Sequence, residues 1–236
     1  MNGYSVRQIP SKQTHEWLMK KHYAHRIPSI SYAFGLYDEA NILQGVCTFG
    51  TPASSSLRSG VCGLKHLDLV LELNRLCLNE ELPVNSASYF ISRCLKELPQ
   101  PSIIVSYSDT AQGHIGYIYQ ALNFIYTGLS AKRTDWKVKG MEGLHGQTIA
   151  DMSRGQENRA DFMRQKYGDD FYLEDRARKH RYVYIVGTKK QKRDLLQDLQ
   201  YPIKPYPKGD NERYDASYEP PVQGILAQID KGSRDE

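Results

Sequence analysis

Two titratable side chains, Asp109 and Tyr119, flank a turn that contains Gly113 and Gly116. Residues 101–105 are apolar and predict a buried strand, which runs through the polar turn into a helix opened by the two glycines. Because glycine lacks a Cβ, the first turn of that helix can approach a ligand closely. The stretch therefore predicts a site between Asp109 and Tyr119. A capped surface helix with the Tyr119 ring in the core is the simpler alternative.

A second strand-to-helix junction could bind an anion. Residues 87–98 carry apolar side chains at helical spacing and predict the clearest helix of the chain, capped by Asn85 or Ser86. The free N–H groups of a helix start, together with the side chains of Asn85, Ser86 and Ser88, could hold a pyrophosphate. Simple N-capping is the alternative. The junction is not glycine-rich, so neither a P-loop nor a dinucleotide-binding motif is predicted.

The strand that precedes this helix is predicted at residues 69–78, where an apolar run is interrupted by Glu72, Asn74 and Arg75. Successive side chains of a strand point to opposite faces. Glu72 and Asn74 should therefore share one face, and Arg75 should point to the other.

His22 and Tyr23 lie at the end of another predicted helix, which Ser11 can cap and which carries Trp17 inward. A histidine and a carboxylate, here His22 and Asp109, could bind a metal ion or transfer a proton if the fold brings them together. They are far apart in sequence, and a surface histidine is the default alternative.

Positive charge is modest overall and concentrated locally. The 236 residues carry a formal net charge of +4, and the pI is about 8.7, which suits an anionic partner without the charge density of a histone-like protein. Basic residues gather at 20–21, at 132–139 around Trp136, and at 176–181. Basic groups interleaved with aromatic rings suit phosphate contact and base stacking. Solvated faces are the commoner explanation for any one cluster.

The remaining pattern predicts a mixed α/β fold with a central sheet covered by helices on both faces. Residues 54–63 read as a surface loop, and residues 130–180 are polar with one helix over 157–167. We predict a domain over residues 1–195 and a Pro-rich, extended or disordered tail over 196–236. Further strands are expected at 31–37, 45–49, 124–129 and 181–187.

The compartment is predicted from absences in the sequence. The four cysteines show no Cys-x-x-Cys pairing, which favours buried reduced thiols. The chain opens without a secretory signal pattern, and its apolar runs are shorter than a membrane span. We therefore expect a cytoplasmic protein, which for a phage-encoded chain is the host cytoplasm, with no membrane partner.

The order of elements and the pattern Tyr119-x-x-x-Asn123-Phe124 resemble the GNAT acyltransferase fold. In that superfamily the helix ends in Tyr-x-x-x-Gly-Phe, and its tyrosine often serves as general acid towards the coenzyme A thiolate. Asn123 replaces the glycine, and asparagine is the next-best residue for a left-handed C-cap. The pyrophosphate loop of the superfamily is represented here only by residues 83–88.

A closer resemblance covers most of residues 4–187. Six segments in the same order are similar to the phage Mom DNA-modification proteins: residues 21–24, 31–35, 72–76, 107–109, 116–121 and 179–184. The resemblance implies a GNAT-fold transferase that converts adenine in double-stranded DNA to N6-carbamoylmethyl adenine and shields phage DNA from restriction. It implies functional roles for six residues: His22, Tyr23, Arg75, Ser88, Asp109 and Tyr119.

With this resemblance, the candidate residues fall into groups. We expect catalysis by His22, Tyr23, Asp109 as base or ligand, and Tyr119 as proton donor. Acetyl-CoA is expected at Arg75, Leu76, Leu78, Asn85, Ser86 and Ser88, and an iron ion held by His22, Tyr23 and Asp109 is consistent with the family. The expected DNA contacts are Lys21, Arg26, Lys132, Arg133, Trp136 and Lys137. A homodimer is a further possibility.

Two other functions fit the same residues. The first is a GNAT-type N-acetyltransferase that uses acetyl-CoA on an amine of a protein or small molecule, with Tyr119 as general acid. The second is a non-catalytic DNA-binding module, which the reduced pyrophosphate loop and the basic clusters favour.

Overall fold

The computed structural model describes residues 1–236 except 2, 145, 211–216 and 219–236. Its main sheet has seven strands in the order β1-β2-β3-β4-β5-β9-β6. These strands are β1 (Ser5–Gln8), β2 (Tyr32–Tyr37), β3 (Leu43–Gly50), β4 (Val70–Leu78), β5 (Ser102–Asp109), β6 (Ile125–Leu129) and β9 (Lys179–Val186). Neighbouring strands are antiparallel except β4 and β5, which are parallel. The mixed sheet and the strands predicted from sequence are confirmed.

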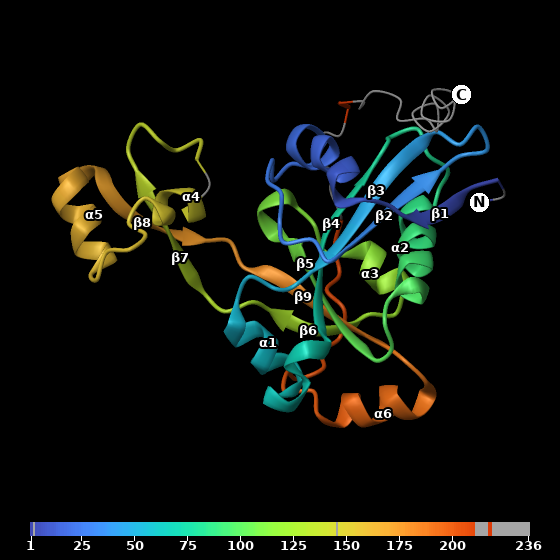
Figure 1. Ribbon diagram of the computed structural model, residues 1–236. Helices are drawn as coiled ribbons and strands as arrows, with labels where there is room; N and C mark the ends of the chain where they lie inside the picture. Colours follow the sequence, from blue (N-terminus) through green and yellow to red (C-terminus); the bar gives the residue numbers. More distant parts are fainter. Residues whose placement is uncertain (2, 145, 211–216, 219–236) are drawn as a thin grey trace, which may run out of the picture.

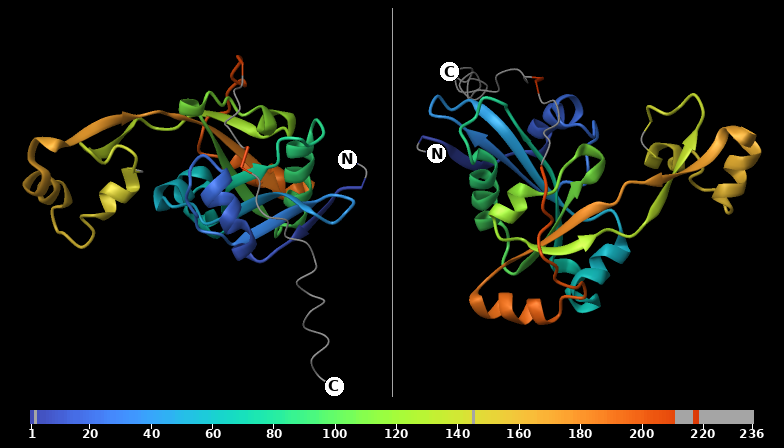
Figure 2. Two further views of the ribbon diagram at one scale, coloured as in Figure 1. Left: turned by 90° about the horizontal axis from the view of Figure 1, so that it is seen from above. Right: turned by 180° about the vertical axis from the view of Figure 1, so that it is seen from behind.

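Helices cover both faces of this sheet, as predicted (Figures 1 and 2). On one face, α2 (Ser86–Glu97) and α3 (Tyr117–Ala121) pack over a core that contains Phe34, Phe90 and Tyr182. On the other face lie α1 (Ser55–Cys62), α6 (Lys189–Gln197) and the short helices η1 (Ser11–Thr14), η2 (Trp17–Lys21) and η3 (Leu64–Leu69). The four cysteines are buried and free, as predicted.

The parallel strands β4 and β5 separate before they end. They pair from Val70 opposite Ile103 to Leu73 opposite Ser106, and the last residues of both strands are not paired with each other. Side chains from both faces of the sheet can reach the opening beyond Leu73 and Ser106. We call this opening the splay.

A β-bulge in β4 controls which side chains face the splay. Thr48 of β3 pairs with Arg75, and the next residue, Phe49, pairs with Leu73, so Asn74 is an extra residue in β4. Asn74 is fixed there because its amide accepts from the Thr48 hydroxyl (2.6 Å) and donates to the Ser29 carbonyl (2.8 Å). The bulge shifts the alternation by one, which places Glu72 and Arg75 on the same face. The prediction of opposite faces was wrong because strict alternation fails at a bulge.

The turn before α3 also differs from its predicted role. Gly113 ends the 3-10 helix η4 (Thr110–Gln112) with φ 62°, and α3 begins only after Gly116, whose φ is 80°. A Cβ on Gly116 would lie 2.5 Å from the ring of Tyr182. The glycine is therefore needed for close packing against a core tyrosine. The left-handed conformation expected at Asn123 is confirmed, with φ 58°.

Residues 131–178 form a second unit, which we call the arm (Figure 1). Its two strands β7 (Arg133–Val138) and β8 (Phe171–Arg176) pair only with each other in the described chain, and they extend away from the main sheet. Helices α4 (Gly146–Asp151) and α5 (Arg159–Tyr167), with the short η5 (Gly168–Asp170), complete it. The sequence predicted α5 but neither the two strands nor α4.

Two other segments differ from expectation. Residues 55–62, predicted as loop, form α1, which Ser54 caps by accepting from the Leu57 N–H. The helix expected from Ser11 is broken into η1 and the π-helix η2, and Ser11 is not its side-chain cap.

The chain beyond α6 packs back on the domain in extended form. Gln200 N–H donates to the Val61 carbonyl (2.8 Å), and Lys204 N–H donates to the Tyr126 carbonyl (2.9 Å). The predicted boundary at 195/196 falls inside α6. Pro220 and Pro221 of the predicted tail lie outside the described residues.

Candidate functional site

The splay brings together side chains that are far apart in sequence. We call this group the splay cluster, and it is made up of His22, Tyr23, Glu72, Arg75, Asp109, Tyr119 and Lys179. Their mutual influence on pKa values places them within electrostatic range of one another. Tyr23 lies within electrostatic range of Asp109, and His22 stacks on Tyr23.

Tyr119 lies at the point where β4 and β5 separate. Its phenol lies near the Ser106 hydroxyl, which donates to the Leu73 carbonyl (2.9 Å), at the last paired position of the two strands. Burial raises the pKa of Tyr119, so the phenol keeps its proton at neutral pH. The ring also contacts Phe124 and Tyr182, so Tyr119 packs in the core as the simpler alternative predicted, and its catalytic role stays a prediction.

His22 and Tyr23 stack on each other where η2 ends, with ring centroids 4.5 Å apart. His22 is 5% exposed, and its burial, followed by the nearby Arg75, lowers its pKa to about 3. The ring is therefore neutral at physiological pH. Its Nδ1 accepts from the Ala24 N–H (3.1 Å), which leaves the proton on Nε2.

Tyr23 also keeps its proton. Burial, reinforced by the charge of Asp109, raises its pKa to about 12, and Arg75 opposes this only in part. Its ring contacts His114 edge-on at 6.0 Å. The pair of rings thus provides a neutral imidazole and a neutral phenol.

Both oxygens of Asp109 have partners. Oδ1 accepts from the Ala111 N–H (3.1 Å), and Oδ2 pairs with Lys179 Nζ at 2.5 Å. The two residues are opposite each other in the β5–β9 ladder. The sequence placed Lys179 in a basic run and in the segment 179–184 but did not pair it with Asp109, because the antiparallel pairing that joins them is a long-range feature.

The root of the arm is fixed beside this ion pair. Thr110 Oγ1 donates to the Arg178 carbonyl (2.5 Å), and Arg178 Nε donates to the Ser130 carbonyl (2.5 Å). A pocket of about 330 Å³ opens there, lined by Asp109, Ala111, Asp135, Glu174, Asp175, Arg176, Ala177 and Lys179. The arm therefore begins at the candidate catalytic carboxylate.

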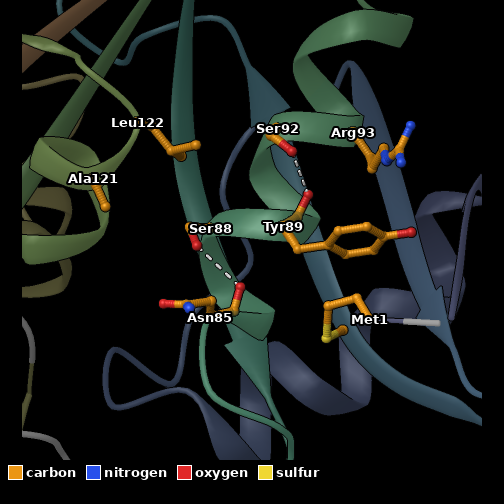
Figure 3. A pocket seen from close by; sticks show the side chains of 8 residues that line it. All are labelled: Met1, Asn85, Ser88, Tyr89, Ser92, Arg93, Ala121 and Leu122. Carbon is orange, nitrogen blue, oxygen red and sulfur yellow. Dashed lines mark hydrogen bonds between the residues drawn. The ribbon is translucent and has the colours of Figure 1, made fainter.

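The residues predicted to bind a cofactor divide between the two faces of the sheet. Asn85 and Ser88 line a groove of about 540 Å³ between α2 and α3, together with Met1, Tyr89, Ser92, Arg93, Ala121 and Leu122 (Figure 3). Ser86 is buried and donates to the Pro83 carbonyl (2.6 Å), and Arg75 lies on the opposite face. Leu76 and Leu78 pack against the α2 side of the core.

The start of α2 is not capped in the way that was predicted. Asn85 adopts a left-handed conformation with φ 70°, and no side chain caps the helix. Ser88 Oγ donates to the Asn85 carbonyl (3.0 Å), so it does not cap the helix N–H groups either. The simple capping alternative was wrong. The Ser86 N–H donates to the Pro83 carbonyl (3.1 Å), whereas the next N–H groups of the first turn have no side-chain cap.

Arg75 has an unused donor. Its Nη1 donates to the Asn74 carbonyl (2.6 Å), and its Nε is buried without a hydrogen-bond partner in the described part of the chain. Burial lowers the pKa of this guanidinium, although Tyr23 and Glu72 oppose the effect. A buried donor without a partner is costly unless a ligand accepts from it.

The donor set does not fit an iron ion. Asp109 is in an ion pair with Lys179. The raised pKa of Tyr23 favours its protonated form. The charged groups near His22 include Arg75 and Lys179. Among the residues that the structure describes, no three His, Cys, Asp or Glu side chains are grouped as metal ligands.

The predicted DNA contacts differ in availability. Arg26, Lys132 and Arg133 are exposed, and the latter two lie at the start of the arm. Lys21 is 2% exposed and its Nζ donates to the Tyr218 carbonyl (2.5 Å), so burial removes it from a phosphate-binding surface.

Trp136 and Lys137 of the arm have internal partners. Trp136 is half-buried against Phe171 at 5.2 Å, within the hydrophobic core of the arm. Lys137 pairs with Glu174 at 3.3 Å. The Trp136 ring therefore contributes to the hydrophobic core of the arm.

No helix among the described residues is long and apolar enough to cross a membrane.

Several solved structures have a similar arrangement of elements. One is an acetyltransferase from Salmonella typhimurium, described as putative and solved with acetyl-CoA, at 8% identity and TM-score 0.43, covering 78% of this chain and 95% of that one. Another is a spermidine N-acetyltransferase from Vibrio cholerae in complex with CoA and spermine, at 11% identity and TM-score 0.41, covering 79% and 97%.

A curated protein is similar over most of its length. The methylcarbamoylase Mom of Escherichia phage Mu is 29% identical over 219 residues, which are 87% of this chain and 86% of that protein. The model of the Mom protein family matches residues 3–208, which include the splay cluster, the arm and the extended segment after α6. The chain therefore belongs to the Mom protein family.

Proposed function

We propose that this chain is a DNA-modification transferase that converts adenine in double-stranded DNA to N6-carbamoylmethyl adenine and so protects phage DNA from restriction. The observation that carries the proposal is the splay cluster, in which a buried imidazole, two protonated phenols, a guanidinium and carboxylates from four separate segments meet. Perturbed titratable groups gathered in this way are typical of catalytic sites.

The neutral groups suit chemistry at a nitrogen that carries no charge. The phenols of Tyr23 and Tyr119 are protonated and can donate to a developing negative charge or to a leaving group. The buried Nε of Arg75 can donate to a carbonyl oxygen of the transferred group. These roles need donors, and all three groups are donors.

The groove between α2 and α3 fits part of an acetyl-CoA molecule. The uncapped α2 start offers N–H groups to a pyrophosphate, and Asn85, Ser88 and Arg93 line the same groove (Figure 3). When bound, acetyl-CoA would supply a two-carbon acyl unit. Asn85 and Ser88 are the residues we assign to holding it.

Double-stranded DNA is the proposed partner. An enzyme that modifies a base must extrude it from the helix, which costs a few kcal/mol that phosphate contacts can offset. Lys132 and Arg133 at the arm root, and Arg26 beside η2, are exposed cations close to the chain segments that build the splay cluster. We assign phosphate contacts to these three.

Mass spectrometry of nucleosides tests the proposal. DNA from cells that express the chain should contain N6-carbamoylmethyl adenosine, and DNA from cells that express Tyr119→Phe should contain at least about 100-fold less, within the range for a lost general acid. Binding of each purified protein to a DNA duplex is measured in parallel as the control.

The other two functions predict different results. Unmodified DNA together with transfer of acetyl label to a protein or small amine would indicate an N-acetyltransferase. A Tyr119→Phe variant with unchanged activity in cells and unchanged DNA affinity would indicate a binding module.

A further inference from the structure

Glu72 is a charged residue of the splay cluster to which neither the motifs nor the proposed function gives a role. The Asn74 bulge places its side chain on the same face of β4 as Arg75, next to the point where β4 and β5 separate. Without the bulge, one of the two would point into the core under α2. The bulge thus adds a second carboxylate, beside Asp109, to the splay.

Burial dominates the environment of Glu72. The desolvation of this half-buried carboxylate raises its pKa, even though the charges of Arg75 and Lys179 lower it. The groups that face it are Arg75 from its own strand, Tyr107 from β5, Lys179 from β9 and Tyr119 from α3. Since burial outweighs two cations, Glu72 binds a proton more readily than an ordinary glutamate does.

The carboxylates of Glu72 and Asp109 differ in their hydrogen-bond and ion-pair partners. Asp109 uses one oxygen for a backbone N–H and the other for Lys179 Nζ. Among the described residues, the Glu72 carboxylate forms no hydrogen bond and no ion pair within 4.0 Å. Both oxygens of Asp109 are therefore engaged within the protein, whereas the Glu72 oxygens are available to accept a proton from a substrate.

We propose that Glu72 is the general base that removes the proton from the acceptor nitrogen, while Asp109 and Lys179 form a structural ion pair. The identity of that nitrogen as adenine N6 rests on the proposed function. In this step the N6–H bond breaks and its proton moves to the Glu72 carboxylate, while N6 forms a bond to the methylene carbon of a donor of the type X–CH2–CONH2 and the bond from that carbon to X breaks. This donor differs from acetyl-CoA, whose methyl carbon carries no leaving group. The leaving group of that donor departs with its electron pair, and a phenol of the splay can protonate it.

The test compares steady-state kinetics of the full chain and its Glu72→Gln variant on duplex DNA. Loss of a general base should lower kcat by about 100-fold or more, with the KM for DNA changed less than about threefold. The wild-type rate should fall as the pH decreases, because Glu72 becomes protonated. This fall in rate at low pH, the acid limb of the pH–rate profile, should disappear in Glu72→Gln. In a separate variant, Glu72→Ala, added formate should restore part of the rate.

Glu97→Gln is the matched control, because Glu97 is exposed at the end of α2. It should keep the wild-type rate and pH profile. A Glu72→Gln variant that keeps more than half of the wild-type kcat would overturn the proposal. So would an acid limb that persists in Glu72→Gln and disappears in Asp109→Asn, which would make Asp109 the base.

Failure of the proposed function gives a different result. If wild-type protein leaves DNA unmodified but transfers an acyl group to an amine, the same variants are assayed on that amine. The acid limb and the formate rescue then decide the role of Glu72 independently of the substrate.

Discussion

The splay cluster and the arm use charged residues in opposite ways. In the splay cluster, Glu72 and Arg75 Nε are at least half-buried and have no hydrogen-bond partners among the described residues. In the arm, charged groups are mostly exposed and paired with each other: Lys137 with Glu174, Lys139 with Asp170, Arg154 with Asp151, Arg164 with Asp161, and Arg176 with Asp135. Exposed pairs contribute little to stability, whereas unpaired buried charges are costly.

This difference separates the roles of the two regions. A fold tolerates uncompensated buried groups mainly where a substrate will complete them. We therefore assign the proposed chemistry to the splay cluster. Five of the ten cations of the arm are in ion pairs, and the arm can contribute binding through exposed cations without such partners, among them Lys132 and Arg133 at its root.

The largest predicted effect on stability is the difference between alanine substitutions at two glycines that have similar backbone angles. Gly116 has φ 80°, and a Cβ at this position would lie 2.5 Å from the Tyr182 ring. Gly140 in the arm has φ 81°, and a Cβ there would have no heavy atom within 4 Å. Gly116→Ala should lower the free energy of unfolding by roughly 2–5 kcal/mol, the sum of left-handed strain and overpacking. Gly140→Ala should cost only the strain, about 1–2 kcal/mol.

Chemical denaturation of both variants measures this difference. Equal decreases in the free energy of unfolding for Gly116→Ala and Gly140→Ala would mean that the Tyr182 side chain moves to make room for the new methyl group. The packing under α3 would then be loose.

The next effect concerns pH. The pKa of His22 is about 3 in the folded protein against an ordinary value of 6.5, so the unfolded chain takes up a proton between these values and the folded chain does not. Stability from neutral His22 is thus complete above pH 6.5 and is lost as the pH falls towards 3. Between these two pKa values the free energy of unfolding should fall by about 1.4 kcal/mol for each pH unit because of this one group.

His22→Gln removes this titration. Its free energy of unfolding should fall less steeply than that of the wild type between pH 6.5 and pH 4, when both are measured by urea denaturation. Parallel curves would contradict a buried neutral His22.

Binding to DNA should show the smallest effects, and these lie in the arm. Lys132→Ala and Arg133→Ala should each weaken duplex binding several-fold and reduce the slope of log affinity against log salt by about 0.9 for each phosphate that the variant no longer neutralises. Lys137→Ala should change the slope less, because Glu174 already neutralises Lys137. A larger effect of Lys137→Ala would show that the arm exchanges its ion pairs for phosphates.

The sequence predicted local features well and long-range ones poorly. The helix over 87–98 and the left-handed Asn123 follow from spacing and capping preferences, and both are confirmed. The Asn74 bulge was missed because its cause lies in Thr48 and Ser29, on other segments. The Asp109–Lys179 pair was missed for the same reason.

The arm shows a different limit. Its strands carry mostly polar residues and bury only a few side chains such as Val138, so their hydrophobic alternation is weak. Asp109, Tyr119, His22 and Tyr23 were proposed from the residue pattern and again through the family resemblance, and the structure added Glu72, Lys179 and Ser106 around them.

The central claim is that the splay cluster works as one catalytic unit, and a double-mutant cycle tests it most directly. Tyr23→Phe, Glu72→Gln and the double variant are compared by the rate of adenine modification in duplex DNA. Residues that act as a unit give strongly non-additive effects on the rate. We predict that the double variant is no slower than the slower single variant, within about threefold. Reductions in kcat that multiply would contradict a shared catalytic centre.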